Sequence, residues 1–392
     1  MRTSRRKNRG PLSGVRVIDA SRVLAGPYLA MLLGDLGADV IKIEKPDGDQ
    51  TRAWGPPWVG EGEHRVSAYY VAANRNKRSV VLDLKLPEAR ETFARLVAGA
   101  DVLVENFLPG EWKRLGFRSA NFRRGHPELV HCTVTSYGTR GPDADRPAYD
   151  VVLQAESGLM SLTGFPEGEP VRVGVAIVDL LTALYGLSAT LAALRERDRT
   201  GRGRRVEIAM LDAGASFLSY AAQSWLADGR QPPPLGSRHP NLAPYQAFAA
   251  SDGWFIVGVG SEDLWRRFCA AIERPDLEAD PRFATNEARV RHREALDGLL
   301  AAVFATRPRA HWDQALRAHR VPGGPTAGVG EAVTAAQARG QVLPLPPGAY
   351  GDLATMAAPF LFDGRRPVPA RAAPALGEHT VEVLRALEKQ RT

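Results

Sequence analysis

The chain has 392 residues, which is more than a single domain usually contains, so the length predicts two domains. Its formal net charge is +7, but five basic residues fall within the first ten positions and the rest carries an excess of only two, which argues against a nucleic-acid-binding protein. No apolar run approaches the roughly 18 residues needed to span a bilayer, and no histidine or cysteine shows metal-ligand spacing, so we expect neither membrane contact nor a metal.

Residues 1–10 contain five Arg and Lys residues and no acid, and we expect them to form a disordered basic tail. This tail has no apolar stretch, so it does not resemble a secretory signal, and we expect a cytoplasmic protein. The two cysteines, Cys132 and Cys269, are isolated in sequence and are expected to be buried and reduced.

Strands and helices alternate after the tail. The β-branched runs predict strands at 15–19, 39–44, 79–84 and 101–105, and the intervening segments predict helices at 28–36 and 87–98. This alternation predicts an α/β fold with a Rossmann-like large domain, a parallel sheet covered by helices on both faces. Ligands of such sheets bind beyond the carboxyl ends of the strands, which here are the loops 21–27, 45–49 and 106–110.

Basic residues gather near these strand ends and helix starts: Lys45, Lys85, Lys113 and Arg114. Such residues are typical of a site for an anionic ligand, although a solvated basic surface would look the same. No Gly-x-Gly-x-x-Gly follows the first strand and no phosphate-binding Walker sequence is present. No Gly-x-Ser-x-Gly elbow occurs, which disfavours a hydrolase triad.

A single carboxylate, Asp179, lies in the apolar helical run 176–184. Burial of a carboxylate is costly unless the group is paired, hydrogen-bonded or protonated. Asp179 is therefore either the cap of its helix, accepting backbone N–H groups one turn on, or a residue that does chemistry. The segment alone leaves both interpretations open.

Beyond residue 200 the pattern predicts a strand at 205–210, a helix at 211–227 and a linker at 232–234. A second unit follows, with strands near 245–248 and 254–259 and helices near 262–272, 286–305 and 308–319, and the chain closes with an amphipathic helix near 379–389. We expect a large domain at 11–228, a smaller α+β domain at 229–335 and a C-terminal segment at 336–392. His239, within Arg-His-Pro-Asn, is either a base or part of a rigid loop.

Many ordered motifs resemble the class III CoA-transferase family of the CaiB/BaiF type, which includes formyl-CoA transferase, carnitine CoA-transferase and the α-methylacyl-CoA racemases. The likeness runs from about residue 11 to about 386 and is densest over 11–210. The motifs are Val-Leu-Ala-Gly-Pro at 23–27, Leu-Gly-Ala-Asp-Val-Ile-Lys-Ile-Glu-Lys-Pro at 36–46, Asn-Lys-Arg-Ser at 76–79, Leu-Asp-Leu-Lys at 82–85, Glu-Asn-Phe-Leu-Pro-Gly at 105–110, Ser-Tyr-Gly at 136–138, Tyr-Asp at 149–150, Ser-Gly-Leu-Met-Ser-Leu-Thr-Gly at 157–164, His-Pro-Asn at 239–241 and Leu-Gly-Glu-His-Thr at 376–380.

The resemblance implies roles for individual residues. Asp179 falls where the family carries its nucleophilic aspartate, and the loop with Gly236, Arg238 and His239 falls where a loop covers the intermediate. Arg238 favours a dicarboxylate such as succinate as a substrate. The positions that the resemblance assigns to binding of substrate and coenzyme A are Leu24, Ala25, Lys45, Leu82, Asp83, Leu84, Lys85, Asn106, Phe107, Leu108, Arg114, Tyr149 and Asp150.

The resemblance also implies the reaction. We expect coenzyme A to move from an acyl-CoA to a free carboxylic acid through an aspartyl anhydride and an aspartyl-CoA thioester, with succinyl-CoA as a candidate donor. No cofactor beyond coenzyme A itself, as substrate and product, is expected. The family further implies an interlocked homodimer, in which the C-terminal segment of each chain returns to the large domain.

Two alternatives remain open. An α-methylacyl-CoA racemase or epimerase needs two groups to move a proton across two faces, and where racemases have His this chain has Tyr149. A non-catalytic acyl-CoA-binding protein would have no use for Asp179. Transfer between carboxylic acids is therefore the favoured interpretation.

Overall fold

The computed structural model describes residues 10–62, 65–117, 122 and 124–389. The basic segment 1–10, for which we expected disorder, lies outside the described residues except for Gly10. The chain divides into two compact units. The first is formed by the described parts of Met1–Met160, Arg172–Arg230 and Ala336–Thr392, and the second by Ser161–Val171 and Gln231–Ala335.

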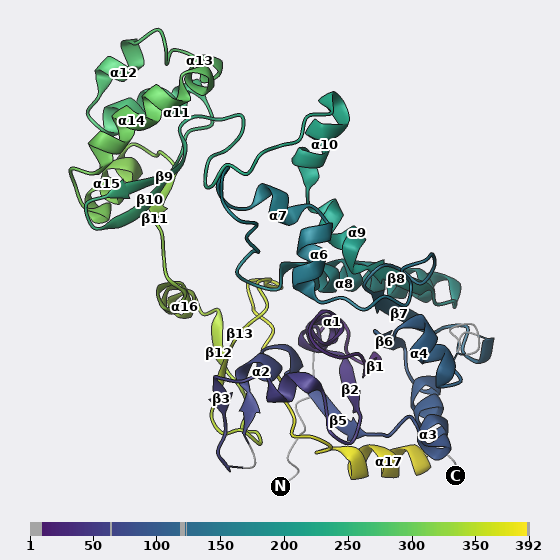
Figure 1. The fold of residues 1–392 in the computed structure, drawn as a ribbon. Helices are drawn as coiled ribbons and strands as arrows, with labels where there is room; N and C mark the ends of the chain where they lie inside the picture. The colour runs from purple at the N-terminus through teal and green to yellow at the C-terminus, as the bar shows by residue number, and fades with distance from the viewer. Residues whose placement is uncertain (1–9, 63–64, 118–121, 123, 390–392) are drawn as a thin grey trace. The chain divides into compact units, whose positions relative to one another are not determined.

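A six-stranded sheet forms the centre of the first unit, with all strands parallel and in the order β5-β2-β1-β6-β7-β8 (Figure 1). The chain starts in the middle with β1, adds two strands on one side, and then returns to add three on the other. The predicted α/β class with a parallel sheet is confirmed. The strands are β1 (Arg16–Ala20), β2 (Asp39–Glu44), β5 (Lys77–Val81), β6 (Val102–Glu105), β7 (Val130–Thr135) and β8 (Arg205–Ala209).

Helices of different lengths and two small hairpins surround this sheet. The helices that lie wholly in the first unit are α1 (Ala25–Asp35), α2 (Ala68–Asn74), α3 (Pro87–Ala98), α4 (Pro109–Arg114), α6 (Asp150–Glu156), α8 (Ile177–Thr200), α9 (Met210–Ser216), α10 (Ser219–Asp228) and α17 (Thr380–Glu388), with a 3₁₀ turn η1 (Gln50–Ala53). The hairpins pair β3 (Trp58–Val59) with β4 (Val66–Ser67) and β12 (Val342–Pro344) with β13 (Ala354–Met356). Two further helices, α7 (Leu159–Leu162) and α16 (Val329–Ala338), cross the boundaries between the units.

Alternate residues of the central strands serve two different apolar layers. In β1, Val17 belongs to one buried cluster and its neighbour Ile18 to the other, and the same alternation separates Val104 from Leu103 in β6. Successive side chains of a strand point to opposite faces, so both faces of this sheet are covered. Near-continuous apolar runs are typical of such doubly covered parallel strands.

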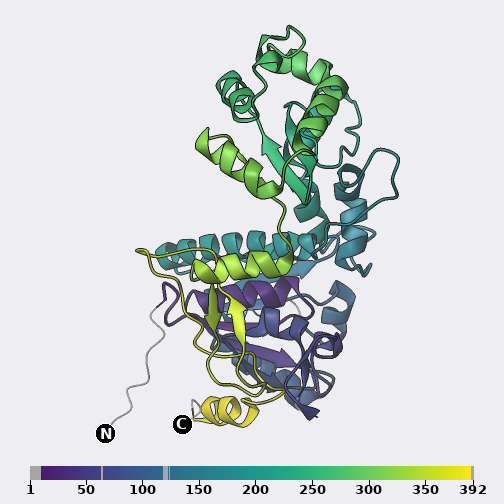
Figure 2. The same cartoon turned by 90° about the vertical axis from the view of Figure 1, so that its left-hand side faces the viewer.

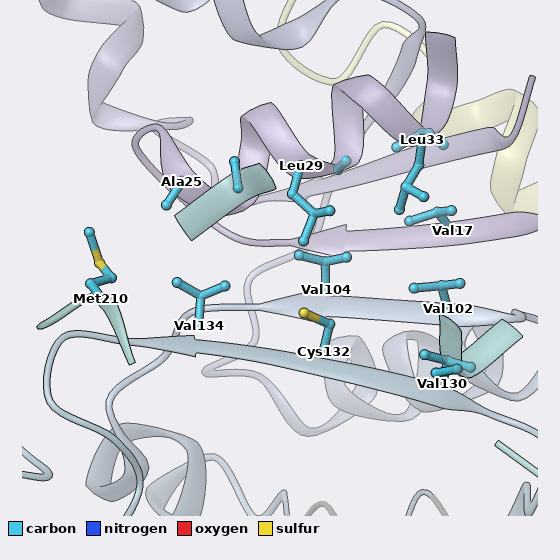
Figure 3. Packing of buried hydrophobic residues seen from close by; sticks show 14 of the residues in the cluster. Val17, Ala25, Leu29, Leu33, Val102, Val104, Val130, Cys132, Val134 and Met210 are labelled. Atoms are coloured by element: carbon cyan, nitrogen blue, oxygen red, sulfur yellow. The ribbon is translucent and has the colours of Figure 1, made fainter. Parts of the chain in front are cut away.

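Helix α1 packs on one face of the sheet directly after the turn that follows β1. Figure 3 shows Leu29 of this helix lying over Val104 and Cys132, within a single buried cluster. Close approach is possible at the start of the helix because residue 26 is glycine, and a Cβ there would overlap the side chain of Ser21. The start of α1 can therefore pack closely against the turn that follows β1.

Helix α8 is long and apolar, and it runs alongside α1 (Figure 2). By length and composition it is the one helix, among the residues described, that could cross a membrane, with a mean hydropathy of 1.7 over its best window and 56% of that window buried within the structure. We expected no membrane-spanning segment, because the sequence contains no uninterrupted apolar run of that length. A buried core helix of a soluble protein has the same properties, and α8 contributes Val178 and Ala183 to the core.

The C-terminal residues return to the edge strand β5. The backbone N–H of His379 donates to the carbonyl of Ser79 at 2.9 Å, and the hydroxyl of Thr380 accepts the N–H of Val81 at 3.1 Å. Helix α17 then lies beside this strand, as both views show (Figures 1 and 2). This segment closes the edge of the sheet.

The second unit has a three-stranded antiparallel sheet of order β11-β10-β9, packed against helices around an aromatic core that includes Phe255, Trp265 and Phe304. Arg289, fully buried, donates to the carbonyl groups of Ala243 and Phe283. The elements are β9 (Tyr245–Ala250), β10 (Gly253–Gly258), β11 (Gly323–Pro325), α11 (Glu262–Ala271), α12 (Pro275–Ala279), α13 (Asn286–Arg291), α14 (Arg293–Phe304) and α15 (Arg309–Ala318).

Two predicted helices are each divided in the structure. The segment 211–227 forms α9 and α10, because Ser219 has a φ of +48°, which a continuous right-handed helix does not accommodate. The segment 286–305 forms α13 and α14, which meet at His292 with a φ of −103° and a ψ of 28°. Apolar periodicity continues across both breaks, so the sequence pattern did not reveal them.

Candidate active site

A cavity of about 450 Å³ opens at the carboxyl ends of the central strands. It lies where the strand order reverses, between β1 and β6, the position at which such sheets bind ligands. The loops that follow these two strands are joined there by Asn106, whose side-chain oxygen accepts the N–H of Arg22 and whose amide donates to the carbonyl of Arg22, both at 2.9 Å. The side chain of Asn106 therefore links two of the loops that line the cavity.

Asp179 lines this cavity and is 8% exposed. It is the third residue of α8, which begins at Ile177 after Ala176, a residue that makes no side-chain cap. The interpretation of Asp179 as the N-cap of its own helix is therefore wrong. An N-cap residue precedes the first residue of its helix and accepts a backbone N–H from the first turn. Asp179 lies within α8, so it does not occupy that position.

The cap of α8 comes instead from Asp150, at the start of α6. Its Oδ1 accepts the backbone N–H of Val178 at 2.8 Å and that of Asp179 at 3.3 Å, and its Oδ2 accepts the amide of Gln154 at 2.6 Å. The oxygen of that same amide accepts the N–H of Val173 at 2.9 Å. Asp150 thus satisfies the first donors of α8, and the carboxylate of Asp179 is not required for capping.

The pKa of Asp179 is raised to about 7. Burial contributes most, the nearby charge of Asp150 adds to it, and the backbone N–H of Ala25 opposes both. Desolvation and a like charge each disfavour the ionised form of an acid, whereas a hydrogen bond to the anion favours it. Near neutral pH this carboxylate therefore exists in both protonation states, poorly solvated and facing a cavity.

Aromatic side chains lie close to the two carboxylates. The pKa of Tyr69 is raised to about 12, by burial first and then by the charges of Asp179 and Asp150. Trp54 contacts the ring of Tyr69 edge-on with centroids 5.3 Å apart, and the ring of Tyr149 at 6.3 Å. Tyr69 and Trp54 did not figure among the site residues expected from the sequence, because they belong to α2 and the loop after η1 rather than to a predicted strand end.

A second cavity, of about 140 Å³, adjoins the first and shares Arg22, Lys45, Phe107 and Glu111 with it. The two together are lined by most of the residues that the family resemblance assigned to substrate and coenzyme A. Those on the first cavity are Ala25, Lys45, Asn106, Phe107, Leu108, Tyr149, Asp150 and Asp179, and those on the second are Lys45, Leu82, Asp83, Leu84, Lys85 and Phe107.

Two predicted binding residues lie elsewhere. Leu24 is buried at the start of α1, and Arg114 is exposed at the end of α4; among the residues described, neither lines these two cavities. Lys113, beside Arg114, lines a third cavity. No group of three or more His, Cys, Asp and Glu side chains in the described part of the chain is arranged to hold a metal ion.

The predicted loop residues Gly236, Arg238 and His239 belong to the second unit. Arg238 forms ion pairs with Glu294 at 3.1 Å and with Asp297 at 2.9 Å, so its charge is already balanced within that unit. Burial and the charge of Arg293 lower the pKa of His239, and its Nδ1 accepts the backbone N–H of Asn241 at 3.1 Å. This hydrogen bond within the loop favours the interpretation of His239 as part of a rigid loop.

Sequence reasoning missed several residues that line the cavity containing Asp179. Val134, Thr135 and Ser136 follow from β7, a strand that the sequence analysis did not name although its run at 130–135 is buried throughout. Met210 follows β8, whose end was predicted. The general rule that ligands meet strand ends would have identified Met210, and it would have identified the other three only if β7 had been predicted.

Comparison with known proteins finds a matching family, similar sequences and similar structures. The family model described as CoA-transferase family III matches residues 12–380. A succinate–glutarate CoA-transferase from Agrobacterium fabrum is 39% identical over 390 residues, 96% of each chain, and an acetyl-CoA:oxalate CoA-transferase from Acetobacter aceti is 40% identical over 337 residues, covering 86% of this chain and 85% of the relative. A crystal structure of a CaiB/BaiF family protein from Brucella suis superposes with a TM-score of 0.87 at 38% identity, covering 96% of this chain and 99% of that one.

Proposed function

Because the chain belongs to CoA-transferase family III, we propose that it moves coenzyme A from an acyl-CoA to a free carboxylic acid with Asp179 as the nucleophile. The observation that carries the proposal is the state of this carboxylate. It lines the cavity, it is largely buried, and the cap of its helix is supplied by Asp150. A poorly solvated carboxylate is a better nucleophile than one in water.

The reaction has four steps, and in each step one anion attacks a carbonyl group and displaces another anion. The carboxylate of Asp179 attacks the thioester carbonyl of the donor, the C–S bond breaks, and an aspartyl anhydride and a coenzyme A thiolate result. The thiolate attacks the aspartyl carbonyl of the anhydride and releases the donor acid as its carboxylate, leaving an aspartyl-CoA thioester. The acceptor carboxylate attacks this thioester and releases the thiolate, which then attacks the acceptor acyl carbonyl and frees Asp179. No proton is transferred in any step, so Asp179 must be ionised at the start.

The two adjoining cavities suit the shape of coenzyme A. We place its nucleotide end near Leu82–Lys85, where Lys45 and Lys85 offer cations to the phosphates, and its thiol end near Asp179. Phe107, which lines both cavities, would lie along the connecting pantetheine arm. In this placement coenzyme A lies along the carboxyl ends of the strands of the six-stranded sheet.

For the acids, we propose dicarboxylates, with succinyl-CoA as a donor. The support is that the names of both relatives contain a dicarboxylic acid, succinate and glutarate in one and oxalate in the other. Arg238, which suggested a dicarboxylate from sequence, is paired with Glu294 and Asp297, so it would have to exchange a protein carboxylate for a substrate carboxylate. A panel of mono- and dicarboxylic acceptors against succinyl-CoA measures this preference directly.

We also propose that two chains form an interlocked homodimer. Helix α10 supports this, since none of its residues is buried among those described and it exposes Tyr220, Trp225 and Leu226 by 61%, 51% and 68%. Exposed apolar surface of this kind is typical of an interaction face. Sedimentation of the purified protein gives the mass of the particle, and a monomer at micromolar concentration contradicts the proposal.

Covalent trapping tests the role of Asp179. The protein is incubated with succinyl-CoA, treated with hydroxylamine, and digested for mass spectrometry; we expect a hydroxamate on the peptide that contains Asp179. Asp179→Asn keeps the shape of the side chain but cannot form the anhydride, so it should bind the acyl-CoA and transfer nothing. A fully active Asp179→Asn variant, or a label confined to another carboxylate, rules the assignment out.

A further inference from the structure

Four buried charges lie beneath the turn that joins β1 to α1. Asp19, Lys42 and Lys77 are fully buried and Asp49 is 3% exposed. They form two ion pairs, Lys77 with Asp19 at 2.8 Å and Lys42 with Asp49 at 3.1 Å. Buried pairs contribute little net stability because both ions lose their hydration, so a pair of this kind calls for an explanation other than stability.

Each pair also holds the backbone of the turn. Lys42 Nζ donates to the carbonyl of Ser21 at 2.9 Å, and Asp49 accepts the N–H of Val23 at 3.2 Å. At the other end, Lys77 Nζ donates to the carbonyl of Pro27 at 2.8 Å. The turn from residue 21 to residue 27 is therefore clamped at its start, its middle and its end by charged groups.

Asp19 and Asp49 are themselves fully engaged. Asp19 accepts both the backbone N–H and the hydroxyl of Ser21. Asp49 accepts the N–H of Thr51 at 3.0 Å and its hydroxyl at 2.8 Å. These bonds leave the two carboxylates little freedom to move away from the turn.

The middle of the turn is strained. Val23 has a φ of +72°, a conformation that a β-branched residue rarely adopts and that is energetically unfavourable. A strained residue persists where its surroundings hold it, and here the carboxylate of Asp49 binds the N–H of this residue. The conformation of Val23 sets the direction in which the chain enters α1 two residues later.

Ala25 is the first residue of α1, and its backbone N–H acts to lower the pKa of Asp179. Val23, Ala25 and Asp179 all line the cavity of about 450 Å³. We propose that Asp49 is a positioning residue, which holds Val23 in its left-handed conformation and so directs the N–H of Ala25 at the carboxylate of Asp179. This inference rests on the proposed role of Asp179 as the nucleophile.

Asp49→Asn tests the proposal, because asparagine keeps one oxygen but loses the charge that binds Lys42 and the N–H groups. We expect kcat to fall between about 10-fold and 100-fold, as misplacement of a reacting group does, with the KM for succinyl-CoA unchanged. The acidic limb of the kcat profile should move to higher pH, since a displaced Ala25 N–H no longer stabilises the Asp179 anion.

A double-mutant cycle with Val23→Gly makes the test specific. Glycine adopts a positive φ without strain, so it needs Asp49 less. We expect Asp49→Asn to lower kcat less in the Val23→Gly background than in the natural sequence, with a difference of about fivefold. Equal effects in both backgrounds would overturn the proposal, as would an unshifted pH profile.

Asp35→Asn is the matched control. Asp35 is also a buried aspartate of an ion pair, with Arg75 at 2.6 Å, but it lies at the far end of α1. It should lower thermal stability without shifting the pH profile; a shift of the same size would mean that any loss of a buried charge produces it, and would overturn the proposal. If Asp49→Asn does not fold, Thr51→Val removes one bond to Asp49 without leaving a buried charge unpaired, and should move the acidic limb in the same direction by less.

A separate experiment tests the proposed function. Hydroxylamine trapping on the natural sequence reports whether Asp179 is the nucleophile, whatever Asp49→Asn does. A label on Asp179 together with an unchanged Asp49→Asn profile rejects only the positioning role. A label on another carboxylate rejects the proposed role of Asp179 as the nucleophile, and with it the positioning role that rests on it.

Discussion

Asp150 caps the helix that carries Asp179: its Oδ1 accepts the N–H of Asp179 at 3.3 Å and that of Val178 at 2.8 Å. The same carboxylate is near enough to raise the pKa of Asp179, after the larger effect of burial. One residue therefore has two opposite consequences. It stabilises the start of α8 and destabilises the ionised form of the residue that this helix presents to the cavity.

The first prediction concerns the pH dependence of transfer. The pKa of Asp179 is raised to about 7, and only the ionised carboxylate can attack a thioester. We expect kcat/KM for succinyl-CoA to fall as the pH drops through about 7, with a slope of one below that value. Initial rates between pH 5 and 9 measure it, and a flat profile across this range contradicts the assigned pKa or the role of Asp179.

The second prediction separates the two effects of Asp150. Asn is about as good a cap as Asp, so Asp150→Asn keeps the cap but removes the negative charge near Asp179. The acidic limb of kcat/KM should then move to lower pH. Asp150→Ala loses the cap as well, and should unfold more easily, by about 1 kcal/mol. An acidic limb that stays in place in Asp150→Asn would show that burial alone sets the pKa of Asp179.

The third prediction concerns stability. A buried acid whose pKa rises from 3.8 to about 7 binds its proton more tightly when folded, so its contribution to the free energy of unfolding is lost as the pH rises from about 4 to about 7. Asp179→Asn has no such proton. We compare the free energy of unfolding of the variant with that of the natural sequence at each pH. The gain of the variant over the natural sequence should be larger at pH 8 than at pH 5, by about 2–3 kcal/mol. Urea unfolding at the two pH values measures the difference, and an equal difference at both pH values would show that the pKa is not raised.

Sequence patterns predicted the elements whose signal is local. Strand β2 at Asp39–Glu44 and helix α3 at Pro87–Ala98 have the predicted bounds, because a β-branched run and a Pro-to-Gly pair specify them without help from the rest of the chain. Helix α2 and strand β7 were not predicted. The break at Ser219 was missed, since apolar periodicity does not report one residue with a positive φ.

The site shows the same division between local and distant information. The sequence singled out Asp179 as an isolated carboxylate, but the choice between cap and chemistry depended on Asp150, which lies 28 residues before Val178 in the chain. The clamp on Val23 comes from Asp49, 26 residues away. Contacts over such separations arise from the tertiary fold and leave no periodic pattern in the sequence.

The fourth prediction compares two cations that the sequence treated alike. Lys45 lines both cavities, whereas Arg114 is exposed and lines neither among the described residues. Lys45→Ala should raise the KM for acyl-CoA by about tenfold, the effect of losing one charge-assisted hydrogen bond, with kcat little changed. Arg114→Ala serves as the comparison and should raise it less. Equal effects would place the phosphates of coenzyme A closer to α4 than the cavities indicate.

The last prediction distinguishes transfer from racemisation. Racemisation of a 2-methylacyl-CoA removes the α-proton from one face and returns it to the other, and so needs two groups with free proton-accepting sites. Here Asp150 is occupied by the N–H groups of α8 and by Gln154, and the residue before it is Tyr149, whose ring lies against Trp54. We therefore expect no α-proton exchange when the enzyme is incubated with a chiral 2-methylacyl-CoA in deuterated water.

Succinyl-CoA and glutarate in the same deuterated buffer provide the positive control for active enzyme, since transfer between carboxylates breaks no C–H bond. Mass spectrometry of both products gives the result in one experiment. Deuterium at the α-carbon of the 2-methylacyl-CoA, at a rate comparable to transfer, would mean that Asp150 leaves its cap during turnover and takes up a proton. Asp150→Asn should then abolish the exchange while transfer persists, which would identify a second activity of the same cavity rather than a different nucleophile.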